Sequence, residues 1–199
     1  PFGAMHIQKL RTRIGTAFGT YLTGSFGPSQ DIYLARNDAK RGRASEKAVA
    51  EQIKKDTQQV LQLQKDADVD FVVDPQFNLF YLFQPFAEHV PGVKPGPQEN
   101  WFNNNVFYWR PQIQGPLEIQ TGFTEKYIHL DTLPANGTGM IILPSPYTLL
   151  MLSDVTGYSS PKEAVTNLAE LLLAEAQHLV SQGIQRIQYD EPAIVVKQS

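Results

Sequence analysis

Cysteine is absent from this sequence of 199 residues, and that absence excludes several kinds of chemistry at once. Without thiols the chain can form no disulfide, no thiolate metal site, no cysteine nucleophile and no CxxC redox pair. Nothing therefore points to an oxidising compartment, and we expect a cytoplasmic protein.

Long apolar runs and a strong charge of one sign are also missing. No uninterrupted apolar segment approaches the roughly 20 residues that a membrane-spanning helix needs, so we expect no membrane span. The formal net charge is -3, from 17 Lys and Arg against 20 Asp and Glu. That balance gives no reason to expect a nucleic-acid partner.

The composition that remains is typical of a globular chain, with 42% hydrophobic and 19% charged residues. Residues 1–5 precede a plausible start at Met5 and have no signal-peptide pattern, so they are interpreted as a tag remnant. We predict a single domain over residues 6–199.

Helix signals are clearest in two segments. Ser45 is a candidate N-cap for a helix over 45–67. A second helix over 161–182 begins with Ser160 as N-cap and carries Glu163 three residues later, which together form a capping box. The 3.6-residue period predicts the buried faces as Val49, Ile53, Val60, Leu63 and Ala67 in the first helix, and Val165, Leu168, Leu172, Ala176 and Leu179 in the second.

Apolar or β-prone segments alternate with these helices and with two weaker ones at 77–90 and 123–130. Such alternation favours an α/β fold built from parallel strand–helix–strand units. An open doubly wound sheet and a (β/α)8 barrel both fit, but residues 15–24 do not provide the GxGxxG of the Rossmann fold. The expected strands lie in 12–26, 70–74, 101–114, 139–143 and 184–189, with loop over 91–97.

Polar residues follow the expected strands, which is where both architectures place function. They are Ser25, Gln76, Ser145 and the adjacent pair Asp190 and Glu191. Carboxylates at a strand end can bind an amine or orient water. The alternative reading is that the carboxylates cap a helix and that the neutral residues close turns.

Aromatic and amide side chains alternate in segment 101–114. Trp101, Asn104 and Tyr108 would suit a flat heterocycle, or a single nucleic-acid strand, by stacking and edge hydrogen bonds. Ordinary core packing with turn amides is the competing interpretation. The four histidines (His6, His89, His129 and His178) have no metal-ligand spacing.

Four segments, taken in order, resemble the cobalamin-independent methionine synthase family, closest to its N-terminal half or its short stand-alone paralogues. Residues 187–193 (IQYDEPA) look like its I-Q-x-D-E-P-A segment, and residues 24–26 (GSF) like its first-strand G-S-F. Residues 143–149 (LPSPYTL) resemble its L-P-G-P-Y-T-L stretch, and residues 101–108 (WFNNNVFY) its W-F-D-T-N-Y-H-Y segment. The same superfamily holds uroporphyrinogen decarboxylase.

The resemblance implies a (β/α)8 barrel that transfers a methyl group from 5-methyltetrahydrofolate to the zinc-bound thiolate of homocysteine. It implies that Ser25 and Asp190 hold the homocysteine backbone, with Glu191 beside them. Gln76 stands where the family has a glutamate, and an amide pairs more weakly with an ammonium group. Trp101, Asn104, Tyr108, Ser145 and Tyr147 become candidates for folate or ligand stacking.

The family holds zinc with His, Glu and two Cys that follow the DEP strand, and this chain has no cysteine. We therefore expect no metal site or cofactor in this chain and no methyl transfer by it alone. A length of 199 residues against the roughly 250 of a typical barrel predicts a barrel truncated after about the fifth strand.

Two alternatives stay open. A non-catalytic barrel could dimerise or dock on a second barrel chain, because an unclosed barrel leaves strand edges exposed. A binder of tetrapyrroles, like uroporphyrinogen decarboxylase, would need clustered arginines, and the loop candidates Arg36, Arg41, Arg43 and Arg110 are scattered in the sequence.

Overall fold

The structure is a computed structural model that describes residues 19–134 and 137–196. The chain divides into two compact units. Unit 1 contains Pro1–Phe77 and His129–Met140, and unit 2 contains Asn78–Ile128 and Ile141–Ser199. The expected tag remnant, residues 1–5, lies outside the described residues, and the single domain over 6–199 stays a prediction.

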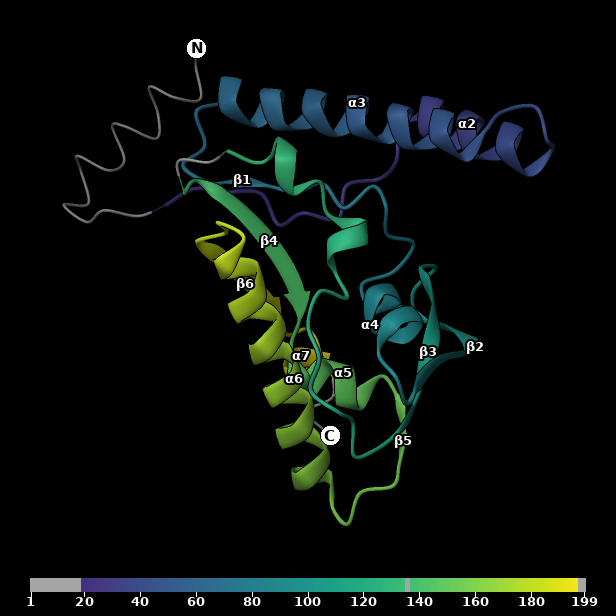
Figure 1. Cartoon of the computed structure of the whole chain (residues 1–199), viewed down its shortest axis with the longest axis vertical. Coiled ribbons are helices and arrows are strands. Elements are labelled where there is room, and N and C mark those ends of the chain that lie inside the picture. The colour runs from purple at the N-terminus through teal and green to yellow at the C-terminus, as the bar shows by residue number, and fades with distance from the viewer. Residues whose placement is uncertain (1–18, 135–136, 197–199) are drawn as a thin grey trace. The chain divides into compact units, whose positions relative to one another are not determined.

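Unit 1 contains two helices, α2 (Gln30–Lys40) and α3 (Glu46–Asp66), which lie side by side (Figure 1). Ser45 caps α3 as predicted, with its Oγ accepting the N–H of Ala48. Ser29 caps α2 in the same way through the N–H of Ile32. Helix α2 was not predicted, because its mixed polar sequence has no clear apolar period.

The buried face of α3 differs in part from its prediction. Val49 and Ile53 are buried and Val60 is half-buried, but Leu63 is 65% exposed and Ala67 is also exposed. The 3.6-residue period continues from Ile53 through Thr57 and Leu61 instead, so Leu63 falls on the opposite side of the helix. The buried positions of α3 thus include the polar residues Asp56, Thr57 and Gln64.

Strand β1 (Val72–Val73) pairs in parallel with β4 (Gly139–Pro144), through Val72 beside Gly139 and Val73 beside Met140. Every residue of β4 is buried, as expected of a strand covered on both faces. Strand β6 (Arg186–Asp190) in unit 2 is the other neighbour of β4. The first expected strand is wrong over residues 19–26, which are irregular, while residues 12–18 lie outside the described part.

Unit 2 contains a second sheet, which corrects the expectation of parallel pairing throughout. Strand β2 (Val93–Asn100) is antiparallel to β3 (Phe107–Gln114), and β3 is parallel to the short β5 (Asp154–Thr156). The loop expected over 91–97 was wrong because two prolines hid β2. The ladder accommodates them with a register shift between Pro95 and Gln98.

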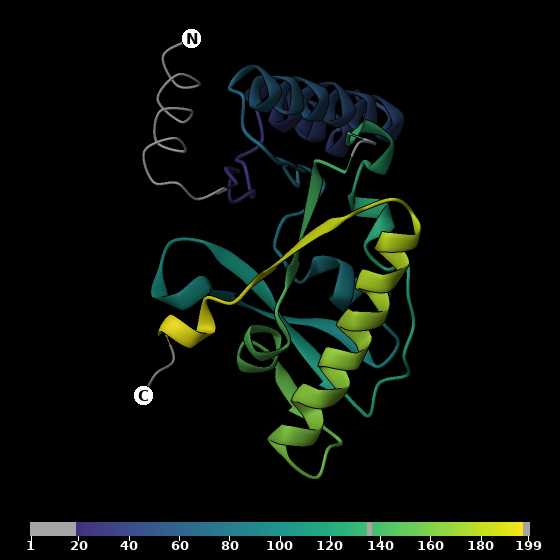
Figure 2. The same cartoon turned by 90° about the vertical axis from the view of Figure 1, so that its left-hand side faces the viewer.

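The remaining elements of unit 2 are short except for one long helix. That helix, α6 (Pro161–Ser181), leads through a turn into β6, drawn in yellow in Figure 2. The helix expected at 123–130 reduces to the 3-10 turn η2 (Glu125–Tyr127), and the 3-10 turn η3 (Leu130–Thr132) lies in unit 1. The others are α4 (Gln84–His89), η1 (Trp101–Asn103), α5 (Pro146–Met151) and α7 (Ala193–Val196).

Helix α6 begins as predicted, with the Oγ of Ser160 accepting the N–H of Glu163. The reciprocal bond of the capping box is shifted by one residue, because the Glu163 carboxylate accepts the N–H of Ser159 at 2.7 Å rather than that of Ser160. Of the predicted buried face, Leu168, Leu172, Ala176 and Leu179 are buried and Val165 is half-buried.

The core of unit 2 joins α6 to the second sheet and to α4. It contains Phe83, Phe86, Tyr108, Ile113, Leu149, Leu168, Leu171 and Leu172. The described strands form two three-stranded sheets and no closed barrel, so the (β/α)8 expectation is met only as a mixed α/β fold. Within the described residues no helix is both long enough and apolar enough to cross a membrane.

Candidate functional site

The first cluster of predicted site residues lies in unit 1, where Ser25, which follows no strand in the described residues, meets Gln76, which follows β1. The Ser25 Oγ donates to the Gln76 Oε1 at 2.9 Å, and the N–H of Phe26 donates to the carbonyl of Pro75. Both residues adopt positive φ, 52° for Ser25 and 60° for Gln76. Strained backbone of this kind in residues other than glycine is concentrated at functional sites.

Asp74, which belongs with Gln76 to the expected polar segment after the second strand, lies between this pair and the end of β1. Its side chain is 3% exposed, and its Oδ1 accepts the N–H of Gln76 at 2.7 Å. Burial raises its pKa to about 6, against the opposing effect of backbone hydrogen bonds from Gln76 and His129. The sequence signal was a carboxylate directly after an apolar strand, the same signal that singled out Asp190.

The second cluster lies in unit 2, where the ends of β4 and β6 meet. The Glu191 carboxylate accepts hydrogen bonds from the hydroxyl groups of both Ser145 and Thr148. Ser145 is also the N-cap of α5, with its Oγ accepting the N–H of Thr148. Glu191 therefore joins the residue after β6 to the first turn of α5. Thr148 was missed, although the S-x-x-T spacing of a capped helix start was visible.

Asp190 lies next to Glu191 and is held by two hydrogen bonds. Its carbonyl accepts the N–H of Ser145 at 3.0 Å, and its Oδ1 accepts the side-chain amide of Gln188 at 2.5 Å. The side chain is half-buried, and burial raises its pKa against the effect of the Gln188 hydrogen bond. Asp190 thus presents a fixed carboxylate at the carboxyl end of β6, while the Glu191 carboxylate is engaged by the hydroxyl groups of Ser145 and Thr148.

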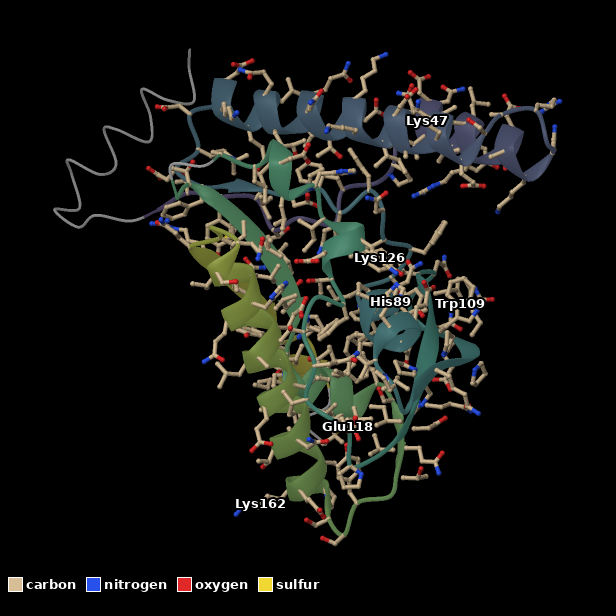
Figure 3. The ribbon with its side chains drawn as sticks, viewed as in Figure 1. Lys47, His89, Trp109, Glu118, Lys126 and Lys162 are labelled. Carbon is tan, nitrogen blue, oxygen red and sulfur yellow. The ribbon has the colours of Figure 1, made fainter. Side chains whose placement is uncertain are left out.

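The aromatic candidates of segment 101–114 are part of the core. Tyr108 is 1% exposed, and its ring meets that of Trp101 edge-on at 5.6 Å and that of Phe83 at 5.9 Å. Asn104 closes the hairpin turn, where its Oδ1 accepts the N–H of Val106. Core packing and turn formation therefore account for Trp101, Asn104 and Tyr108, and the stacking role is not proposed further. Trp109 of β3, labelled in Figure 3, is 39% exposed, and Phe107 of the same strand is 47% exposed.

The structure thus brings Ser25 together with Gln76 and Ser145 together with Glu191, with Asp190 beside the second pair. The first pair is described in unit 1 and the second in unit 2. Tyr147 lies on α5, half-buried, next to Thr148.

The residues present do not fit the zinc site that the family resemblance implies. In residues 19–134 and 137–196 no three or more His, Asp or Glu side chains form a group that could hold a metal ion. The sequence supplies no cysteine to complete one. No step of the chemistry is therefore assigned to a metal held by the described residues.

Comparison with known sequences identifies one family. A family model described as "Cobalamin-independent synthase, Catalytic domain" matches residues 18–197. The chain is 28% identical over 177 residues to a methionine synthase of Sulfurisphaera tokodaii, covering 88% of this chain and 52% of that protein. It is 25% identical over 193 residues to a 5-methyltetrahydropteroyltriglutamate–homocysteine methyltransferase of Dictyostelium discoideum, covering 94% of this chain and 23% of that protein.

Solved structures agree in fold. A B12-independent methionine synthase from Shewanella sp. W3-18-1, in complex with selenomethionine, superposes with a TM-score of 0.61 at 24% identity, over 77% of this chain and 46% of that one. A putative vitamin-B12-independent methionine synthase from Listeria monocytogenes gives 0.69 at 18% identity, over 90% and 53%. This chain spans about half the length of these archaeal and bacterial relatives. It belongs to the cobalamin-independent methionine synthase family.

Proposed function

We propose that the chain binds homocysteine, or a closely related amino acid, at the strand ends of a barrel of the homocysteine methyltransferase kind. In this proposal β1, β4 and β6 are strands of a (β/α)8 barrel. The observation that carries it is Asp190, a half-buried carboxylate fixed by Gln188 and by the bonds of Ser145 and Glu191. A fixed carboxylate suits a hydrogen-bond donor of an amino-acid ligand, because a charged acceptor strengthens the hydrogen bond.

Recognition of the rest of the amino acid is assigned by the resemblance to Ser25 and Gln76. Their mutual hydrogen bond and positive φ angles support a prearranged pair. Binding to prearranged groups loses less conformational entropy than binding to mobile ones. The folate substrate of the family is a second ligand in this proposal, because methyl transfer to a thiol needs a methyl donor.

Activation of the thiol is proposed to come from outside the described residues. A thiol becomes a good nucleophile when its pKa is lowered, and the described residues offer no donor set that would hold the family's zinc to do so. Taken alone, the chain is therefore proposed to bind its ligand without producing methionine. An assay with homocysteine and 5-methyltetrahydrofolate that yields methionine would contradict this part of the proposal.

Isothermal titration calorimetry of the full chain tests the binding. L-homocysteine and 5-methyltetrahydrofolate are titrated in separate experiments, and the absence of heat with L-homocysteine would overturn the proposal. Asp190→Asn should weaken homocysteine binding by about tenfold or more, since a hydrogen bond to a charged group contributes about 1.5–3 kcal/mol. Glu118→Gln, which removes the same charge at an exposed position of unit 2 (Figure 3), should leave the affinity within about twofold.

A non-catalytic partner is the second candidate function. It is favoured by α7, where Ile194, Val195 and Val196 are 54%, 76% and 53% exposed. Two copies of this chain could bury these side chains against each other about a two-fold axis, the commonest symmetry of homodimers. Sedimentation equilibrium of the full chain should then show a dimer that Val195→Lys converts to a monomer. A monomer at all concentrations would contradict this candidate.

The tetrapyrrole alternative gains no support from three of its four candidate arginines, Arg36, Arg43 and Arg110. Arg43 pairs with Asp38 at 2.5 Å, and Arg110 pairs with Glu99 at 3.0 Å and with Asp154 at 2.8 Å. Arg36 donates to the carbonyl of Phe77. These guanidinium groups are engaged within the protein, so we do not propose that they bind the acidic side chains of a tetrapyrrole.

A further inference from the structure

Asp74 is a buried carboxylate with an incomplete set of hydrogen bonds. One of its oxygens, Oδ1, accepts the N–H of Gln76, while Oδ2 has no hydrogen-bond partner among the described residues. Its own N–H donates to the carbonyl of Met140, which extends the pairing of β1 with β4 and fixes the backbone of Asp74. A buried polar atom without a partner costs free energy, so its retention calls for an explanation beyond folding.

Among the described residues, no charged side chain contributes to the shifted pKa of Asp74. The causes of its raised pKa are burial and two opposing backbone hydrogen bonds, with no contribution from a charged side chain. Titratable and charged groups of unit 1 include Arg36 on α2, the buried Asp56 and Lys54 on α3, His129, and Asp131 on η3, which pairs with Lys54. Arg36 donates to Phe77, and the pKa of His129 is lowered mainly by burial.

Gln76 connects Asp74 to the candidate site. Its N–H is held by Asp74, and its side-chain oxygen accepts the Ser25 hydroxyl. Gln76 has φ of 60°, a conformation that few side-chain-bearing residues adopt, so the bond from Asp74 helps to keep it there. A neutral amide attracts an ammonium group only weakly, whereas a buried carboxylate two residues away acts through a medium of low dielectric constant.

We propose that Asp74 is a positioning residue that orients Gln76 and supplies the negative charge for the ammonium group of an amino acid bound at the Ser25–Gln76 pair. This inference rests on the proposed homocysteine-binding function. It explains how a chain with glutamine at this position can still favour a cationic group. It also explains why the unpartnered oxygen of Asp74 is retained.

Calorimetry with two ligands tests the proposal on the full chain. L-homocysteine carries the ammonium group, and 4-mercaptobutyrate is the same molecule without it. Asp74→Asn keeps an oxygen acceptor for the N–H of Gln76 but removes the charge. It should weaken L-homocysteine binding about tenfold at pH 7.5 and change 4-mercaptobutyrate binding less than about twofold. Asp131→Asn, an exposed carboxylate of the same unit, is the matched control and should leave both affinities unchanged.

The pH dependence gives a readout that a merely structural role would not move. In the wild type, the affinity for L-homocysteine divided by the affinity for 4-mercaptobutyrate should rise about tenfold from pH 5 to pH 7.5, as Asp74 ionises. Effects of His129 that are common to the binding of both ligands cancel in this ratio. The ratio should be flat for Asp74→Asn, and if that variant does not fold, the wild-type series decides alone.

Three results would overturn the inference. Equal affinities of wild type and Asp74→Asn for L-homocysteine would refute it while leaving the proposed function intact. If Asp74→Asn lost affinity for both ligands equally, and the wild-type affinity ratio did not change with pH, Asp74 would be a purely structural residue. No heat from the wild type with L-homocysteine would refute the proposed function, and this inference with it.

Discussion

At the scale of single residues, three aspartates show how surroundings set the behaviour of one chemical group. Burial raises the pKa of Asp74 and of Asp190, each of which follows a strand. Asp131 is more exposed, and its hydrogen bond to Lys54 lowers its pKa. Carboxylates held with a raised pKa at strand ends are typical of functional sites, while the Asp131 pair is typical of a surface.

Removal of the Asp74 charge should change how stability depends on pH. The pKa of Asp74 is raised from 3.8 to about 6, so the folded chain binds its proton more tightly than the unfolded chain does. The free energy of unfolding therefore falls as pH rises from about 4 to about 6, by roughly 3 kcal/mol, and is level above that range. Asp74→Asn should lack this fall and be more stable than the wild type at pH 7.5.

Urea denaturation at a series of pH values measures this difference. Since all other titrating groups are common to both proteins, subtracting one curve from the other isolates Asp74. Asp131→Asn should show the opposite sign, a small loss of stability above pH 4. Parallel curves for wild type and Asp74→Asn would contradict the prediction.

Glu191 should be more important for holding the second cluster than for touching a ligand. Glu191→Gln keeps one acceptor oxygen, but its amide nitrogen cannot accept the second of the hydroxyl protons from Ser145 and Thr148. We expect a loss of about 1–3 kcal/mol in the free energy of unfolding and a weaker affinity for L-homocysteine, because Asp190 loses its support. Thermal denaturation and calorimetry measure both, with the exposed Glu170→Gln as control.

At the scale of elements, β1 is a strand of two residues that depends on a helix side chain. Gln64 of α3 donates from its Nε2 to the carbonyl of Val73 and accepts the N–H of Val73 on its Oε1, at 2.9 and 3.0 Å. The buried amide thus replaces a neighbouring strand on one side of β1, while β4 pairs with the other side. Asp74 and Gln76 follow directly, so Gln64 also supports the first cluster.

Gln64→Leu should destabilise the protein by roughly 2–4 kcal/mol, because it leaves the buried N–H and carbonyl of Val73 without partners. Gln62→Leu is a matched control on the same helix, where the side chain is exposed and bonds only Asp66. It should change stability by less than about 0.5 kcal/mol. Chemical denaturation compares the two variants, and equal losses would show that the effect belongs to the helix rather than to the amide.

Element predictions succeeded where the deciding signal was local. Ser45 and Ser160 cap helices at the predicted residues, because a cap acts on N–H groups two or three residues away. The hairpin of β2 and β3 was missed because its pairing joins Val93 to Ile113 across Pro95 and Pro111, which suggest loop when read alone. The predicted burial of Leu63 in α3 was wrong for a related reason, because the neighbouring elements decide which face of the helix is covered.

At the scale of the whole molecule, the family assignment and the site lead to different expectations about metal. The chain belongs to a family of methionine synthases, yet it has no cysteine, and the described residues hold no cluster of metal ligands. It also spans about half the length of its archaeal relatives. Ligand binding and thiol activation can therefore be tested as separate properties of this chain.

Zinc should have little effect on the protein. With equimolar Zn²⁺ or with EDTA, we expect the melting temperature to shift by less than about 1 °C, because a ligand that binds the folded state tightly would raise it by more. Elemental analysis after dialysis should find clearly less than one zinc per chain. A stoichiometric zinc content would contradict the prediction and would place a site among residues outside the described ranges.

The sequence by itself determined the absence of cysteine, the capped helices, the α/β class and the family, because these depend on composition or on residues close together in the chain. It also named Ser25, Gln76, Ser145, Asp190 and Glu191 as strand-end residues. Only the tertiary structure decided that Glu191 holds the hydroxyl groups of Ser145 and Thr148 while Asp190 is presented, that Tyr108 lies in the core, and that Asp74 lies buried against Gln76. Burial and pairing between distant segments decide these roles, and no local pattern encodes them.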